Sequence, residues 1–133
     1  MNTRNDQQVQ IEMMRQEAQV LFVQVLQDGA FQRLGARDLR TSDGVLVKGH
    51  LKPDATRRLF EAIPDDFRET AGHYNDPDAT GDRMGLSIIL RRNGTEEVFQ
   101  MVYGSQSTGP TQEIKDFVIT AIQLTEPAYQ AHL

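Results

Sequence analysis

The sequence predicts a small single domain of the α+β class, with an antiparallel sheet of about four strands packed by helices in the order α-ββ-α-ββ-α. A length of 133 residues is typical of one domain. The pair Asn93-Gly94 separates two β-rich runs, residues 85–91 and 97–103, and Asn-Gly indicates a hairpin because both residues accept positive φ. Helical patterns that open with proline follow each of two predicted hairpins.

The first element is predicted to be a helix over about residues 7–27, ended by Asp28-Gly29. Apolar residues recur there at spacings of three and four: Ile11, Met14, Ala18, Leu21 and Val25. Residues 20–26 are also rich in β-branched side chains, so a helix that gives way to a strand near Val20 is the alternative.

A shorter hairpin and a second helix follow. Residues 37–41 and 45–50 flank Ser42-Asp43-Gly44, which is typical of a turn between two strands. Pro53 then opens a helix for which Asp54 is the candidate cap. The apolar face of this helix is formed by Leu59, Phe60 and Ile63.

The closing hairpin and helix supply the predicted core. Alternation points Leu86, Ile88 and Leu90 inward, together with either Val98, Gln100 and Val102 or Phe99, Met101 and Tyr103. Phe117 and Ala121 complete the core from the last helix, whose cap is predicted at Ser107 or Thr108 and which we expect Pro127 to end.

Composition excludes several classes of function. A net charge of -5 argues against nucleic acid as a partner, and the lack of cysteine excludes disulfides and thiolate chemistry. No apolar run is long enough for a membrane span, and residues 1–8 read as a disordered arm without a signal peptide. We therefore expect a cytoplasmic protein, or an exported one if a signal peptide has been removed, with its domain at residues 9–127 and a tail at 128–133.

No motif predicts an enzyme, a cofactor or a metal site. Residues 76–82 carry alternate carboxylates, like the start of a calcium loop, but the twelfth position from Asp76 is Ser87 and not glutamate. His50, His73 and His132 lack the spacing of a zinc pair.

The long irregular region at residues 64–84 is the predicted contact surface, because long loops in compact domains are often functional. Phe67 and Tyr74 are the candidate aromatic anchors for a protein partner, and Asp76 and Asp78 are the candidate acidic contacts. The alternatives are that Phe67 belongs to the core, and that the region binds a small ligand or ion.

Two family resemblances point to protein binding. The chain resembles emfourin-type domains, small bacterial inhibitors of thermolysin-like metalloproteases, over residues 20–124: Gln27-Asp28-Gly29-Ala30-Phe31, Asp43-Gly44-Val45, Leu59-Phe60, and residues 86–90 with Asn93-Gly94 before a closing helix. This resemblance implies a strand at residues 20–26, although Asp-Gly-Ala-Phe stands where Gly-Gly-Phe is expected. Residues 31–35, followed by Asp43-Gly44, are also similar to the opening of class I type III secretion chaperones.

We therefore expect a non-enzymatic protein-binding module, such as an inhibitor of a bacterial protease or another enzyme. The alternatives are a secretion-chaperone-like acidic binding protein and a small ligand- or ion-binding domain that uses residues 64–84. A protein partner is expected, and a homodimer is one alternative for the oligomeric state.

Overall fold

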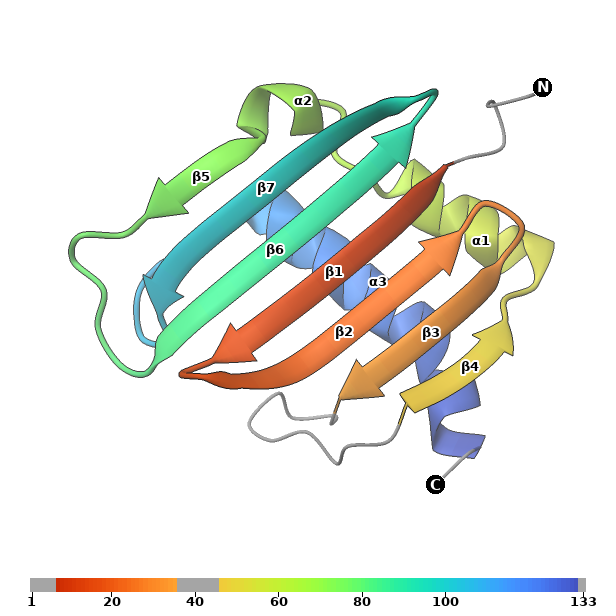
Figure 1. The fold of residues 1–133 in the computed structure, drawn as a ribbon, viewed down its shortest axis with the longest axis horizontal. Helices are drawn as coiled ribbons and strands as arrows, with labels where there is room; N and C mark the ends of the chain where they lie inside the picture. Colours follow the sequence, from red (N-terminus) through yellow and green to blue (C-terminus); the bar gives the residue numbers. More distant parts are fainter. Residues whose placement is uncertain (1–6, 36–45, 132–133) are drawn as a thin grey trace.

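The fold is a single seven-stranded sheet with its two longer helices on one face (Figure 1). The computed structural model describes residues 7–35 and 46–131. The strands are β1 (Gln8–Arg15), β2 (Ala18–Leu26), β3 (Ala30–Gly35), β4 (Leu46–His50), β5 (Gly72–Asn75), β6 (Arg83–Arg92) and β7 (Thr95–Gly104). The helices are α1 (Pro53–Glu61), α2 (Phe67–Thr70) and α3 (Gln112–Ala131). The strand order is β4-β3-β2-β1-β6-β7-β5, which places β1 at the centre.

The core lies between the sheet and the helices. In Figure 1, α3 runs diagonally behind the sheet and α1 lies behind its β2–β4 side. Every second strand residue points toward these helices, and this face of the sheet is called here the covered face. Its buried apolar side chains include Val9, Ile11, Val23, Val25, Phe31, Val47, Leu86, Ile88, Leu90 and Phe99. They pack against helical side chains that include Leu59, Ile114, Phe117 and Ala121.

The predicted fold class is wrong in the size of the sheet and in the order of elements. The sheet has seven strands and not about four, and the order is ββββ-αα-βββ-α. The predicted helix over residues 7–27 is instead the hairpin of β1 and β2, joined at Gln16 and Glu17. The reason lies in the alternation of Val9, Ile11 and Met13, all buried, with less buried neighbours, which matches a period of two. The implied strand at residues 20–26 lies within β2.

Two further strands lie where none was predicted. Strand β3 pairs antiparallel with both β2 and β4, so that β4 completes a hairpin with β3. The strand predicted at residues 37–41 lies outside the described residues. Strand β5 lies within the region predicted to be irregular and pairs in parallel with β7, which makes the sheet mixed.

The hairpin of β6 and β7 is confirmed. All ten residues of each strand pair in register, and the turn residues Asn93 and Gly94 have φ of 52° and 77°, as a type I′ turn requires. The inward sets are also confirmed: Leu86, Ile88 and Leu90 are buried on β6, and Phe99 is buried on β7.

The helix boundaries are partly corrected. Helix α1 begins at Pro53 as predicted, but Lys52 is its N-cap, and the Asp54 carboxylate accepts a hydrogen bond from Arg57 at 2.9 Å instead of capping. At α3, Thr111 Oγ1 accepts from the backbone N–H of Ile114 at 3.4 Å, so the cap is neither Ser107 nor Thr108. Helix α3 continues through Pro127 to Ala131, into the segment predicted as a tail.

Candidate functional site

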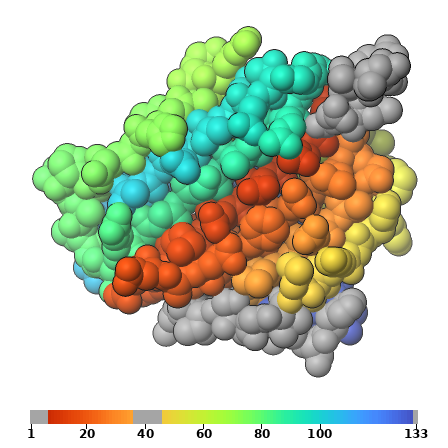
Figure 2. All heavy atoms as spheres, in the orientation of Figure 1, coloured from red at the N-terminus to blue at the C-terminus, as the bar shows by residue number. Residues whose placement is uncertain are grey.

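The second face of the sheet carries no helix among the described residues, and it is called here the open face. In Figure 2, which views the molecule from this side, the strands form a broad surface that no helix crosses. The pairing registers place its side chains in cross-strand rows. One row runs Leu46–Leu34–Phe22–Glu12–Ser87–Gln100, and the next runs Lys48–Gln32–Gln24–Gln10–Ile89–Val98.

The open face mixes apolar and amide side chains. Eight of its residues are large and apolar: Met14, Phe22, Leu26, Leu34, Leu46, Ile89, Val98 and Val102. Leu26 is 37% exposed and Leu46 is 46% exposed. The amides include a ladder across three strands, in which Gln32 Nε2 donates to Gln24 Oε1 at 3.4 Å and Gln10 lies opposite Gln24. A water-facing sheet surface is normally polar, so this composition requires a different explanation.

Charge is scarce and nearly balanced on this face. Its described ionised side chains are Glu12, Lys48, Arg83, Arg91 and Glu96, three positive and two negative, while the whole chain carries -5. Arg91 and Glu96 pair with each other at 2.7 Å, and Glu12 accepts a hydrogen bond from Gln19. The net charge of the open face is therefore close to zero, and the acidic excess lies elsewhere on the chain.

A shallow depression of about 220 Å³ lies on the open face around Gly85. Side chains from three neighbouring strands surround it: Glu12, Met14, Ser87, Gln100 and Val102. Nothing in the backbone requires glycine at this position, because φ of Gly85 lies outside the positive region and an added Cβ would meet only Met14 Cβ, at 3.7 Å. Glycine weakens the interior of a strand and often marks a place where another molecule approaches closely.

A second depression of about 190 Å³ lies on the other half of the open face, over Ala30. Its side-chain walls come from β2, β3 and β4 and include Gln24, Leu26, Gln32 and Lys48. The polar groups of the first depression are the Glu12 carboxylate, the Ser87 hydroxyl and the Gln100 amide, and Lys48 lines the second.

The two predicted aromatic anchors are held within the fold. Phe67 is fully buried, which agrees with the alternative prediction that it belongs to the core. Tyr74 is 44% exposed, but its ring packs on Phe99 with centroids 5.5 Å apart, and its hydroxyl donates to the Thr70 carbonyl at 2.6 Å. Tyr74 thus ties β5 to α2 on the covered side, away from the open face.

The predicted acidic contacts form a local turn. Asp76 Oδ1 accepts from the backbone N–H of Asp78 at 2.9 Å, and Asp78 is exposed. Asp82, at the far end of the calcium-like segment, pairs with Arg15 Nη2 at 2.6 Å. In the described part of the chain, no group of three or more histidine, aspartate or glutamate side chains is placed to hold a metal ion.

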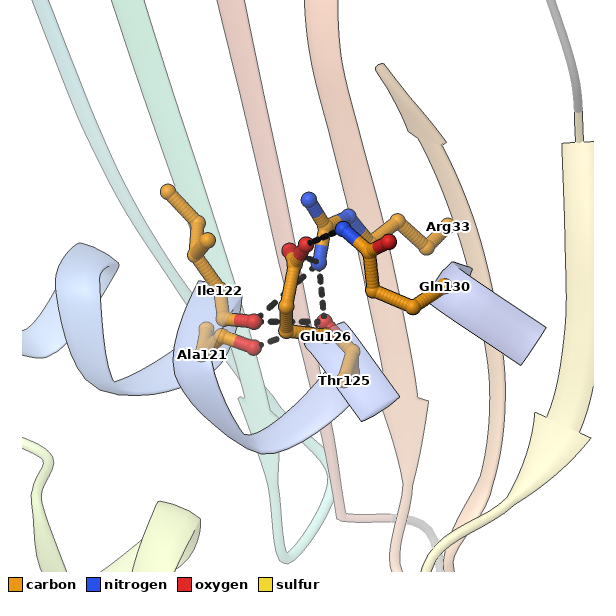
Figure 3. A network of polar contacts seen from close by, with 6 residues as sticks. All are labelled: Arg33, Ala121, Ile122, Thr125, Glu126 and Gln130. Carbon is orange, nitrogen blue, oxygen red and sulfur yellow. Dashed lines mark hydrogen bonds and ion pairs between the residues drawn. The ribbon is translucent and has the colours of Figure 1, made fainter. Parts of the chain in front are cut away.

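A buried cation on the covered face was missed by sequence reasoning. Figure 3 shows Arg33 of β3 reaching α3, where Nη1 donates to the Ile122 carbonyl at 3.1 Å and to Thr125 Oγ1 at 3.2 Å and pairs with Glu126 at 2.8 Å. The guanidinium also lies over the Tyr129 ring at 4.4 Å. Its Nε and Nη2 are buried without a hydrogen-bond partner. This cluster anchors the end of α3 to the sheet, on the side opposite to the two depressions.

The open face had one signal in the sequence. Gln8, Gln10 and Glu12 alternate with Val9, Ile11 and Met13, a pattern typical of a strand with one buried side. The size of the open face had no signal in the sequence, because seven strands form it and their order is set only by the fold.

In the described residues, no helix is long and apolar enough to cross a membrane. A comparison with protein-family models finds no match to this chain, and a comparison with curated proteins finds none either.

Proposed function

We propose that the protein is a non-enzymatic protein-binding module and that the open face of its sheet is the binding surface. The observation that carries this proposal is the apolar content of a broad sheet face that no described helix covers. Soluble monomers rarely expose apolar patches larger than a few hundred Å², and larger ones mark interaction sites.

The composition of the open face supports a protein partner. The centres of protein interfaces are depleted in charged residues and enriched in aromatic residues and methionine. The open face has Phe22 and Met14 among its apolar side chains, and its few charges nearly cancel. Amide side chains such as Gln24 and Gln32 can hydrogen-bond a partner without the desolvation cost of an ion.

The chemistry of the depressions also favours binding over catalysis. Glu12 is the one carboxylate that lines the depression at Gly85, and it is already hydrogen-bonded to Gln19. Ser87 lies opposite Glu12 on the neighbouring strand, but a serine acts as a nucleophile only when a base accepts its proton, and the described contact of the Glu12 carboxylate is with the Gln19 amide.

A matched pair of substitutions tests the proposal. Ile89→Lys places a charge in the open face, and Ile119→Lys makes the same change on the outer side of α3, where Ile119 is 47% exposed. A tagged chain would be purified from its native host after mild cross-linking, and the proteins joined to it would be quantified. We expect Ile89→Lys to lose the cross-linked partner and Ile119→Lys to keep it, with both variants folded by circular dichroism.

A third variant tests the surface that the sequence predicted. Asp78→Ala alters the 64–84 region at an exposed side chain and leaves the open face intact. Loss of the partner in this variant, together with its retention in Ile89→Lys, would assign binding to the 64–84 region and refute the open face.

A further inference from the structure

The open face is self-complementary, and we propose that it binds the open face of a second copy of this chain. Two copies would pack their open faces together about a twofold axis that runs along β1. Phe22 and Leu34 of each copy would then enter the depression at Gly85 of the other. This inference rests on the proposed function, because it names the partner of the same surface.

Charge favours a second copy over a strongly charged partner. The three positive and two negative side chains of the open face nearly cancel, whereas the chain as a whole carries -5. Contact through any acidic surface would bring like charges together, and like charges across an interface are costly. The open face is a surface on which two copies can meet with little net repulsion, and its main unfavourable pair is Glu12 with Glu12 of the second copy.

The size of the face is sufficient for a stable dimer. Seven strands spaced by about 4.8 Å span roughly 30 Å. The four longest strands, β1, β2, β6 and β7, have 8 to 10 residues each, and at about 3.3 Å per residue they are roughly 26 to 33 Å long. Allowing for the shorter edge strands, the contact would cover roughly 600 to 750 Å² per copy, near the about 800 Å² per partner of standard interfaces.

The positions of the Phe22–Leu34 pair and of the depression at Gly85 indicate where the twofold axis of the dimer lies. Strand β1 has three strands on each side, and Phe22 on β2 and Ser87 on β6 flank Glu12 in one row. A twofold rotation about β1 exchanges the two sides of the sheet. The apolar ridge of Phe22 and Leu34 in one copy therefore faces the depression around Gly85 in the other.

The depression has room for this insertion. Its volume is about 220 Å³, and an enclosed cavity of about 150 Å³ accommodates a benzene ring. Two sheets packed face to face at about 10 Å interlock their side chains in this manner. The glycine at position 85, which the fold itself does not require, is explained as the space that the partner's ring occupies.

The decisive variant is Gly85→Leu, which fills the depression without straining the backbone. Sedimentation equilibrium of the purified chain over the micromolar range would measure the dimer. We expect the natural chain to dimerise and Gly85→Leu to raise the dissociation constant by about tenfold or more. Its melting temperature at low protein concentration should not fall, so that dissociation cannot be attributed to unfolding. Ile119→Lys should leave the dimer unchanged.

A charge variant tests the axis. Rotation about β1 places the Glu12 carboxylate of one copy directly opposite the Glu12 carboxylate of the other. Glu12→Gln should therefore tighten the dimer several-fold, and an unchanged affinity would refute this axis.

Failure of the inference and failure of the proposed function give different results. A natural chain that stays monomeric, or a Gly85→Leu variant with unaltered affinity, refutes the second copy as occupant. If that monomer still cross-links to a different protein in an Ile89-dependent manner, the open face remains a binding surface. If Ile89→Lys changes neither self-association nor cross-linking, both proposals fail.

Discussion

The two faces of one sheet differ in what their side chains contact. On the covered face, Ile11, Ile88 and Leu90 are fully buried, and the helices exclude water from them. On the open face, the same strands present Gln10, Ser87 and Ile89, which no described helix covers. The backbone is shared, so the contrast shows that the layer packed on a face, and not the strand itself, decides which side chains stabilise the fold.

Each face also holds side chains that are unusual for it: a buried charge on the covered face and exposed apolar groups on the open face. The covered face holds one fully buried cation among the described residues, Arg33, and stabilises it with a carboxylate, a carbonyl, a hydroxyl and an aromatic ring from α3. The open face holds apolar side chains such as Phe22 and Ile89 without such compensation. We attribute the first departure to the attachment of α3 and the second to binding.

The largest expected effect is on the covered face. Phe117→Ala should lower the free energy of unfolding by about 3 to 5 kcal/mol, because the ring is fully enclosed between α3 and the sheet. Ile119→Ala, on the exposed side of the same helix, should change it by less than about 0.5 kcal/mol. Urea unfolding midpoints measure both, and equal midpoints would contradict the placement of the core.

The next largest effect concerns the buried cation. Glu126→Ala removes the carboxylate that neutralises Arg33 and should cost about 1.5 to 3 kcal/mol. Arg33→Met keeps an aliphatic side chain under α3 and leaves no buried charge, so it should cost less than Glu126→Ala. The reverse order in thermal or urea unfolding would mean that the aromatic and carbonyl contacts of Arg33 outweigh the burial of its charge.

Two glycines should respond in opposite directions. Gly85→Ala on the open face should raise the free energy of unfolding by about 0.4 to 1 kcal/mol, because it restricts the unfolded chain without native strain. Gly35→Ala should destabilise, since Gly35 has φ of 136° and an added Cβ would lie 2.5 Å from the Val20 carbonyl oxygen. Melting temperatures measured at low protein concentration compare the two, and a loss of stability in Gly85→Ala would show that the depression is needed within the monomer.

The smallest effect appears only at alkaline pH. Burial raises the pKa of Tyr103 above its ordinary value of 10.0. The unfolded chain therefore releases this proton first, and the stability that Tyr103 contributes is complete below pH 10.0 and is lost as pH rises toward its folded pKa. Tyr103→Phe should remove this loss while stability at neutral pH changes little. Parallel unfolding curves for both chains above and below pH 10.0 measure the difference.

The burial of Arg33 could not be predicted from the sequence, because it depends on strand pairing and not on the residues next to it. Arg33 follows Gln32, and either could face the core of an isolated strand. Pairing of Arg33 with both Val23 and Val47 fixes it on the covered side, opposite Thr125 and Glu126. The same contacts explain why α3 persists past Pro127, which has no N–H for the Gln123 carbonyl, since Arg33 holds the turn just before it.

The missed hairpin of β1 and β2 has a local cause. Its turn uses Gln16, with φ of 54°, and Glu17, where glycine or asparagine would have marked it. Without that signal, apolar residues on two separate strands coincide with helical spacing. Of these, Ile11, Leu21 and Val25 are buried, but Met14 is only half-buried and Ala18 is exposed.

The sequence by itself determined the elements whose signals are local: the hairpin at Asn93-Gly94, the helix that opens at Pro53, and the apolar face of α3 at Phe117 and Ala121. These depend on the φ preferences of turn residues and on periodicity within one segment. Only the tertiary structure decided the seven-strand order, the burial of Arg33 and Phe67, and the open face with its depression at Gly85. Each of these depends on pairing or packing between segments far apart in the chain, which no local preference specifies.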